Sequence, residues 1–274
     1  MNITNTIKFN SIYELGLASQ VNLTKDNHAP TGGAIGGDTN MSMTQAVNSA
    51  LQGGYYPEGA RQLQDAAAQM PETDVSVALI SKTIHAEHGF RPNVPAYLSN
   101  EPQNMYNVAP TDKPNRLIKI AVHVGKEYSI EAKQTFNRGR AIMAVIDSLT
   151  ASGYNVELTA IWRNQTHSGD TLSIETIIKH SDDSYSPDSI AFALCNEAFQ
   201  RRLYWLALET HDSSTARVLT GNGYGHGAKA QYPEYDLHYG FMRDHRHWNN
   251  PEQALKHIVD DTRAQLNKPL QAAA

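Results

Sequence analysis

The most regular hydrophobic pattern in the chain runs from residue 115 to residue 163 and predicts a β–α–β unit. An apolar run from Leu117 to Val124 has the length and composition of a buried strand. Apolar and small residues then recur at helical spacing between Ile130 and Ala151, and Tyr154 to Arg163 reads as a second strand. A strand, a helix and a second strand in this order are typical of an α/β fold.

The pattern remains regular beyond this unit. Leu172 to His180 is a further predicted strand, and the turn residues Ser168–Gly169–Asp170 allow it to pair with Tyr154–Arg163 as an antiparallel hairpin. The remaining predictions are a helix from Pro187 to Glu209, a final strand from Arg217 to Thr220, an irregular segment from Gly221 to Trp248, and a terminal helix that begins at Asn250–Pro251.

The first 114 residues are patterned less regularly and predict short helices separated by loops. Ser42 and Gln45 form a capping box in front of a helix from Met43 to Leu51. Other predicted elements are a helix from Ser11 to Gln20, a glycine-rich loop from Asn27 to Asn40, a helix from Pro57 to Gln69, and a strand from Asp74 to His85. Five prolines between Gly89 and Pro114 indicate an extended, turn-rich segment that wraps a surface or links two parts.

A series of short motifs resembles an uncharacterised family. The motifs are Gly53–Gly54–Tyr55–Tyr56–Pro57–Glu58–Gly59–Ala60, Pro95–Ala96–Tyr97–Leu98 with Glu101–Pro102, and Asn137–Arg138–Gly139–Arg140–Ala141 ahead of Asp147 and Gly153–Tyr154–Asn155–Val156–Glu157–Leu158. The resemblance covers roughly residues 42 to 230. That family, a domain of unknown function, occurs in bacteriophages, plasmids and bacterial genomes. The resemblance implies a mobile-element origin and supplies no activity.

The segment after the first strand of the β–α–β unit gives a second resemblance. His123–Val124–Gly125–Lys126–Glu127–Tyr128–Ser129 stands where the von Willebrand factor A-type fold has Asp-x-Ser-x-Ser and binds a divalent cation. The aspartate and the paired serines are missing, and hard cations need clustered oxygen ligands. The resemblance therefore implies the topology of that fold with a degenerate metal site.

Together these patterns predict an α/β fold with a Rossmann-like, von Willebrand A-like mixed sheet flanked by helices, and an N-terminal helical and irregular extension. We expect residues 115–274 to form the sheet domain with a C-terminal helix. Residues 1–114 form the helical and proline-rich extension, which packs on that domain. In such sheets ligands bind beyond the carboxyl ends of strands, so Gly125–Ser129 and Gly221–Trp248 are the segments to search.

Composition excludes several classes of protein. A net charge of −5 with no basic run does not indicate a strong grip on nucleic-acid phosphates, although a local basic groove stays open. The single cysteine, Cys195, excludes an internal disulfide framework and suits a reducing compartment. No apolar run is long enough to cross a bilayer, and Met1–Phe9 lacks the pattern of a signal peptide.

Candidate ligand-binding residues gather near the C-terminus. They are His226, Arg243, His245, Arg246, His247 and Trp248. If the segment is extended, His245 and His247 point the same way and share a metal or a phosphate. Arg243 and Arg246 suit an anion, and Trp248 suits a stacked base. The alternative is an aromatic loop that packs over the sheet edge and ends at the cap of the last helix.

Other motifs do not define a site. His85 and His88 flank Glu87 without the zincin spacing, and Gly221–Gly227 matches neither a P-loop nor a Rossmann fingerprint. Cys195 lies inside an apolar helical pattern and reads as a buried thiol. We assign no catalytic residues, no cofactor and no resident metal.

We therefore expect a non-enzymatic phage or mobile-element protein that binds a phage or host protein, or itself, in an assembly. The expected location is the cytoplasm of a bacterial host or a virion. The alternative is a phosphate-directed, metal-dependent enzyme or a nucleic-acid-binding protein that uses the histidine- and arginine-rich loop.

Overall fold

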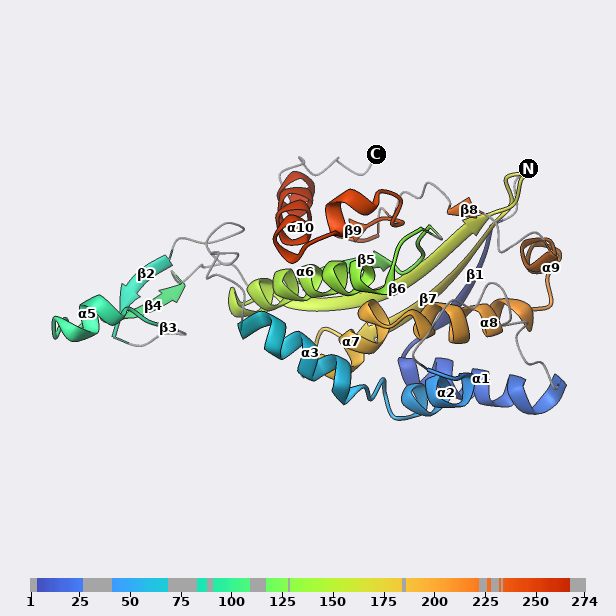
Figure 1. Ribbon diagram of the computed structural model, residues 1–274, viewed down its shortest axis with the longest axis horizontal. Coiled ribbons are helices and arrows are strands. Elements are labelled where there is room, and N and C mark those ends of the chain that lie inside the picture. Colours follow the sequence, from blue (N-terminus) through green and yellow to red (C-terminus); the bar gives the residue numbers. More distant parts are fainter. Residues whose placement is uncertain are drawn as a thin grey trace.

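The protein has a mixed α/β fold, which confirms the predicted fold class (Figure 1). The computed structural model describes residues 4–26, 41–68, 83–87, 91–108, 117–127, 129–183, 186–221, 226–227, 232 and 234–266. Among these residues, no helix is both long enough and apolar enough to cross a membrane.

The main sheet has the strand order β1-β7-β6-β5-β9, and β8 pairs with β6 beyond the end of β5. Its strands are β1 (Thr4–Phe9), β5 (Leu117–His123), β6 (Asn155–Gln165), β7 (Thr171–Lys179), β8 (His226–Gly227) and β9 (Leu237–Tyr239). Strand β5 is parallel to both β6 and β9, whereas β6 and β7 are antiparallel and β1 is parallel to β7. The carboxyl ends of β5 and β9 therefore lie at the opposite end of the sheet from those of β1 and β7.

Helix α6 (Ala132–Ala151) connects β5 to β6 and completes the predicted β–α–β unit. A capping box between Glu131 and Gln134 starts the helix. Gly153, with φ +83°, ends it, because the positive φ lets the chain turn back toward β6. The predicted hairpin is also confirmed: β6 and β7 are joined by a turn in which Gly169 has φ +92°.

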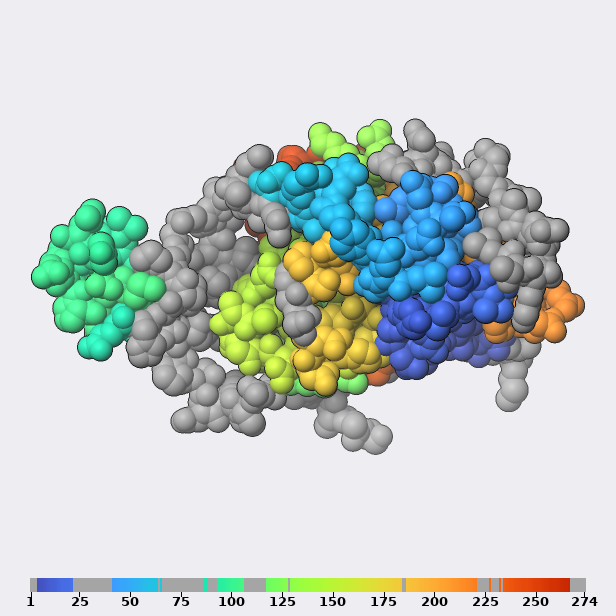
Figure 2. All heavy atoms as spheres, turned by 90° about the horizontal axis from the view of Figure 1, so that it is seen from below, coloured from blue at the N-terminus to red at the C-terminus, as the bar shows by residue number. Residues whose placement is uncertain are grey.

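Several helices cover the sheet and share one core with it. They are α1 (Ile12–Asp26), α2 (Met43–Leu51), α3 (Pro57–Ala68), α7 (Pro187–Cys195), the π-helix η1 (Phe199–Tyr204), α8 (Trp205–Glu209), α9 (Ser214–Gly221) and α10 (Pro251–Leu266). Figure 2 shows α1, α2 and α3 spread across one face of the molecule. A single apolar cluster includes Phe9, Leu15, Val47, Leu63, Ile120, Ile146, Phe192 and Leu255. The division near residue 114 stays a prediction.

A small second sheet lies away from the main one, at one end of the long axis (Figure 1). It has the order β2-β4-β3, from β2 (Thr83–Ala86), β4 (Met105–Val108) and β3 (Arg91–Pro92), and carries the short helix α5 (Val94–Leu98). The side-chain oxygen of Asn93 caps α5 by accepting from the Ala96 N–H at 3.3 Å. This unit includes the middle of the proline-rich segment. Most of the strand predicted over Asp74–His85 lies outside the described residues.

Three sequence predictions about the C-terminal half are wrong. Residues 217–220 form part of helix α9, because the Ser213 hydroxyl caps the segment and Thr215, Ala216 and Leu219 are buried at helical spacing. The helix predicted from Pro187 to Glu209 breaks at Asn196, which has an extended backbone, before η1 begins. The segment predicted to be irregular contains β9, which pairs with β5 in the main sheet.

Candidate functional site

The two segments singled out for ligand binding meet at the carboxyl end of β5. Lys126 forms a parallel bridge with Met242. The Met242 N–H donates to the Gly125 carbonyl at 3.2 Å, and the Glu127 N–H donates to the Met242 carbonyl at 2.9 Å. We call this junction the β5 rim. Its position beyond a strand end is where α/β proteins commonly bind ligands.

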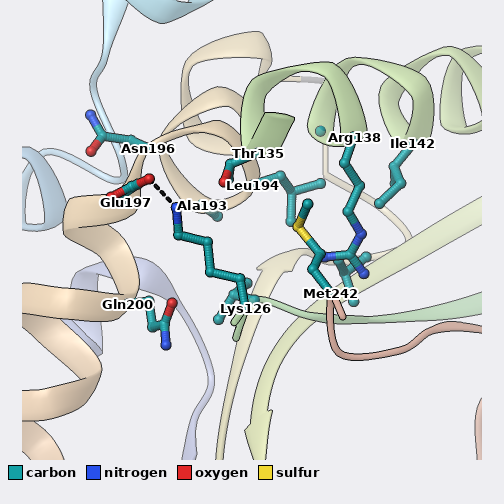
Figure 3. A pocket seen from close by; sticks show the side chains of 13 residues that line it. Lys126, Thr135, Arg138, Ile142, Ala193, Leu194, Asn196, Glu197, Gln200 and Met242 are labelled. Carbon is teal, nitrogen blue, oxygen red and sulfur yellow. Dashed lines mark hydrogen bonds and ion pairs between the residues drawn. The ribbon is translucent and has the colours of Figure 1, made fainter. Parts of the chain in front are cut away.

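A buried ion-pair cluster occupies the β5 rim (Figure 3). The Lys126 ammonium pairs with the Glu197 carboxylate and donates to the Ile130 carbonyl at 2.5 Å. Arg201 Nε lies 3.5 Å from the other Glu197 oxygen. The side chains of Lys126, Glu197 and Arg201 are only 3%, 10% and 14% exposed. Burial lowers the pKa of Lys126, and its bond with Glu197 acts in the opposite direction.

Arg138, from α6, ties two strand ends together. Its guanidinium donates to the carbonyl oxygens of His123 at 2.8 Å, Tyr239 at 3.0 Å and Gly240 at 2.7 Å. The side chain also lies 5.8 Å from the centre of the Trp248 ring. Burial lowers its pKa to about 10, so the group stays charged at neutral pH. Arg138 thus joins the ends of β5 and β9 through their backbone carbonyls.

His123, the last residue of β5, is buried and held by the backbone. Its Nδ1 accepts from the Gly125 N–H at 2.9 Å, and its Nε2 lies 3.1 Å from the Arg163 backbone nitrogen. Nε2 lies 3.1 Å from the Arg163 carbonyl oxygen. Burial lowers the pKa of His123 to about 4. The imidazole is therefore neutral at physiological pH, with both nitrogens in use.

The space between these groups is small. A cavity of about 10 Å³, lined by residues that include Lys126, Arg138, Asn196, Glu197 and Gln200, lies between β5, α6 and the start of η1. That volume holds about one water molecule. The cavity lining holds two cations, Lys126 and Arg138, and one carboxylate, Glu197, and this excess of positive charge disfavours a metal ion. Within the described ranges, no three His, Cys, Asp or Glu side chains are arranged to hold one.

The loop residues predicted to bind a ligand are engaged mainly with the protein itself. Arg243 donates to the Gly227 carbonyl at 3.0 Å, next to the backbone of His226 in β8; the His226 side chain lies outside the described residues. Arg246 makes a two-pronged contact with Asp244, with Nη2 2.6 Å from Oδ2. These bonds lower the pKa of Asp244. The charges of Arg246 and Asp244 thus offset each other.

His245 and His247 do not lie on an extended segment, so that part of the prediction is wrong. They belong to the 3₁₀ helix η2 (His245–Trp248), which the Asp244 side chain caps by accepting from the Arg246 N–H at 2.9 Å. With three residues per turn, side chains two apart diverge. His247 instead stacks on His257 of α10, with ring centres 4.2 Å apart.

The same short helix is anchored to α6. The Asn137 side chain donates to the Trp248 carbonyl at 2.8 Å, and the Gln134 side chain donates to the His245 carbonyl at 3.3 Å. Trp248 is buried, whereas His245 and Arg246 are exposed. The structure therefore brings Trp248 to Arg138 at the β5 rim and leaves His245 and Arg246 on the surface. Their roles in ligand binding stay predictions.

Comparison with known proteins gives a family without an activity. No curated protein and no solved structure matches the chain. The von Willebrand A-type topology and the phage origin therefore stay predictions. A family model described as Domain of unknown function (DUF7192) matches residues 5–267, which confirms an uncharacterised family and extends the expected range of 42–230 at both ends. The chain belongs to this DUF7192 family.

Proposed function

We propose that the chain is a non-enzymatic protein of a phage or related mobile element that binds a partner protein in an assembly, with helix α5 as its contact element. The observation that carries this proposal is the exposure of three large apolar side chains on α5. Val94, Tyr97 and Leu98 are 57%, 65% and 77% exposed. We call them the α5 surface.

The spacing of these residues places their side chains on one face of α5. Positions 94, 97 and 98 are i, i+3 and i+4 of a helix and share one face. Ala96 is 5% exposed and packs inward. Apolar anchors at this spacing are typical of a helix that lays one face into a hydrophobic groove of another protein.

The charge around α5 favours an uncharged partner groove. Between residues 91 and 108, Arg91 and Glu101 are the charged residues of the sequence. Electrostatic steering by this unit is accordingly weak, and affinity has to come from apolar burial. The unit also lies apart from the main sheet, where a partner can reach it (Figure 1).

The titratable groups at the β5 rim fit this proposal better than a catalytic role. A general base needs a free nitrogen or carboxylate within reach of a substrate and a pKa near the working pH. His123 has both nitrogens bonded and a pKa of about 4, and Glu197 is bound by Lys126 and Arg201.

The proposal is tested by replacing the α5 surface with serines, V94S/Y97S/L98S. Wild-type and variant proteins are immobilised and exposed to lysate from phage-infected host cells, and captured proteins are identified by mass spectrometry and re-tested in purified form. The matched control is Y55S/V218S, since Tyr55 and Val218 are also exposed apolar residues, at 54% and 45%.

We expect the wild type and the control to bind the same purified partner, and the triple variant to lose it. A partner that binds the triple variant equally well contradicts the assignment to α5. Size-exclusion chromatography with light scattering tests self-association, and a clean monomer that binds no phage or host protein contradicts the proposed function. A titration with single-stranded DNA against salt tests the phosphate-directed alternative, because phosphate contacts give a steep salt dependence.

A further inference from the structure

A second and larger hollow lies at the opposite end of the sheet from the β5 rim. It is a groove of about 270 Å³, bounded by the start of α1, the end of β7 and the start of α7. Two neighbouring parallel strands, β1 and β7, end beside it, and each is followed by a helix. This is the arrangement in which open α/β sheets bind ligands beyond strand carboxyl ends.

The groove contains a buried positive charge. Lys179 lines it and is 7% exposed. Its ammonium donates to the Val156 carbonyl at 3.1 Å and the His180 carbonyl at 2.9 Å. An ammonium has three N–H donors, so one is left over. In the described part of the chain no carboxylate pairs with Lys179, and a buried charge without a counter-ion is unfavourable.

The start of α1 adds further donors to the same groove. Ile12 and Tyr13 line it, and their backbone N–H groups have no acceptor among the described residues. The Ser11 hydroxyl accepts from the Glu14 N–H, and the Ser11 carbonyl accepts from the Leu15 N–H. Free N–H groups at a helix start carry partial positive charge and favour an anion.

Four further polar residues line the groove, and most of their polar atoms are bonded within the protein. Ser189 donates to the Gly53 carbonyl at 2.7 Å, and its hydroxyl lies 2.9 Å from that of Ser186. His180 Nε2 lies 2.9 Å from the Asn10 carbonyl oxygen. Asp183 also lines the groove and accepts from the His180 N–H at 3.0 Å. Its negative charge repels an anion, so removal of that charge by substitution is a second test of anion binding.

We propose that this groove binds the phosphate group of a small phosphorylated molecule, with Lys179 and the first turn of α1 as its main contacts. Lys179, Ile12 and Tyr13 all line this open groove, and phosphate oxygens accept several donors at once. The volume, near the lower end for ligand pockets, suits a small ligand. The proposal is independent of the α5 surface.

The test is a titration of the isotopically labelled full-length protein with inorganic phosphate, followed by two-dimensional amide NMR. Sodium chloride at matched ionic strength is the control, and sodium acetate tests a carboxylate ligand. We expect saturable shifts at the amides of Ile12, Tyr13 and Lys179 with phosphate and weaker binding of acetate. The absence of saturable shifts at these amides overturns the proposal. Acetate that binds there as tightly as phosphate overturns the phosphate assignment.

Two variants sharpen the result. K179M removes the buried charge and should weaken phosphate binding at least about tenfold, as loss of a charge-assisted hydrogen bond predicts. The matched control is K119M, since Lys119 pairs with Glu157 at 3.4 Å elsewhere on the sheet and should leave binding unchanged. D183N should tighten binding several-fold. If K179M does not fold, D183N and the wild-type titration still decide, because unchanged or weaker binding by D183N contradicts the proposed position.

Discussion

The β5 rim and the α5 surface use their side chains in opposite ways. At the rim, Lys126, Glu197 and Arg138 are buried and bonded to one another or to backbone carbonyls. On α5, Val94, Tyr97 and Leu98 are exposed, although side chains of this kind are normally buried. The rim therefore contributes mainly to stability, whereas the α5 surface contributes little to stability and is available for binding. Substitutions in the two regions should separate these roles.

The largest effect on stability is expected from Arg138→Met. The substitution leaves three carbonyl oxygens, of His123, Tyr239 and Gly240, without their donor. Each unsatisfied buried group costs roughly 1–3 kcal/mol, so the free energy of unfolding should fall by about 4 kcal/mol. Chemical denaturation measures it, with R217M as the control because Arg217 is 75% exposed. An equal fall in the free energy of unfolding in the two variants would contradict the structural role of Arg138.

The next largest effect is expected from Lys126→Met. Removal of the ammonium leaves Glu197 buried with Arg201 as its remaining charged neighbour, and breaking such a pair costs about 3 kcal/mol. The double variant K126M/E197Q removes both charges and should recover most of the loss. If the double variant is less stable than K126M, the ion pair itself stabilises the fold, and the loss in K126M does not come from the unpaired carboxylate.

An effect of similar size is expected from pH, through His123. The pKa of this side chain is about 4 in the fold against an ordinary value of 6.5, so the unfolded chain takes up the proton first as pH falls. The stability contributed by the neutral imidazole is complete above pH 6.5 and is lost between pH 6.5 and 4, by at most about 1.4 kcal/mol per pH unit.

The variant H123Q keeps a polar group at this position and lacks the titration. Wild-type and variant stabilities measured by denaturation from pH 4 to pH 7.5 should therefore diverge in slope below pH 6.5. The pKa of His257 is also lowered, but this residue is present in both proteins, so its contribution cancels in the difference between their slopes. Parallel slopes would mean that His123 is accessible to protons in the fold.

The smallest effect is expected from the α5 surface. Each of V94S, Y97S and L98S should change the free energy of unfolding by about 0.5 kcal/mol or less, since exposed side chains contribute little. Within the same helix, A96D should disrupt the small sheet, because Ala96 is 5% exposed. Hydrogen exchange of residues 91–108 measures both. Strong destabilisation by the serine variants would place these side chains in the fold rather than at a contact surface.

Local signals made much of the fold predictable. The capping box of Ser42 and Gln45 is complete within four residues, and the helix starts where it predicts. Signals that depend on distant partners were missed. Strand β9 has three residues, too few to show a period, and β1 gains its strand character from β7. Residues 217–220 combine valine, leucine and threonine, which favour strands locally, yet burial of one face makes them helical.

The position of the β5 rim could be predicted from the sequence, but the side chains that interact there could not. The strand end and the downstream loop could both be singled out from the sequence, because topology tells where strands end, and the structure brings them together. Ligand binding there stays a prediction. Lys126 and Glu197 are 71 residues apart, so nothing local to either residue reveals the pair. Arg138 gave a weak signal, as an arginine next to the apolar stripe of a helix. The α5 surface was hidden within a proline-rich segment that lacks a clear period.

The pairing of β1 with β7 has a consequence for the order of events during synthesis. Thr4 and Thr171 are hydrogen-bonded across this edge but stand 167 residues apart in the chain. A ribosome that adds roughly 5–20 residues per second needs on the order of ten to thirty seconds to make that intervening length. During that time Ile7 and Phe9 lack the strand with which their backbone later pairs. The newborn chain thus presents an unpaired, partly apolar strand to chaperones, and β1 can join the sheet only after β7 has been made.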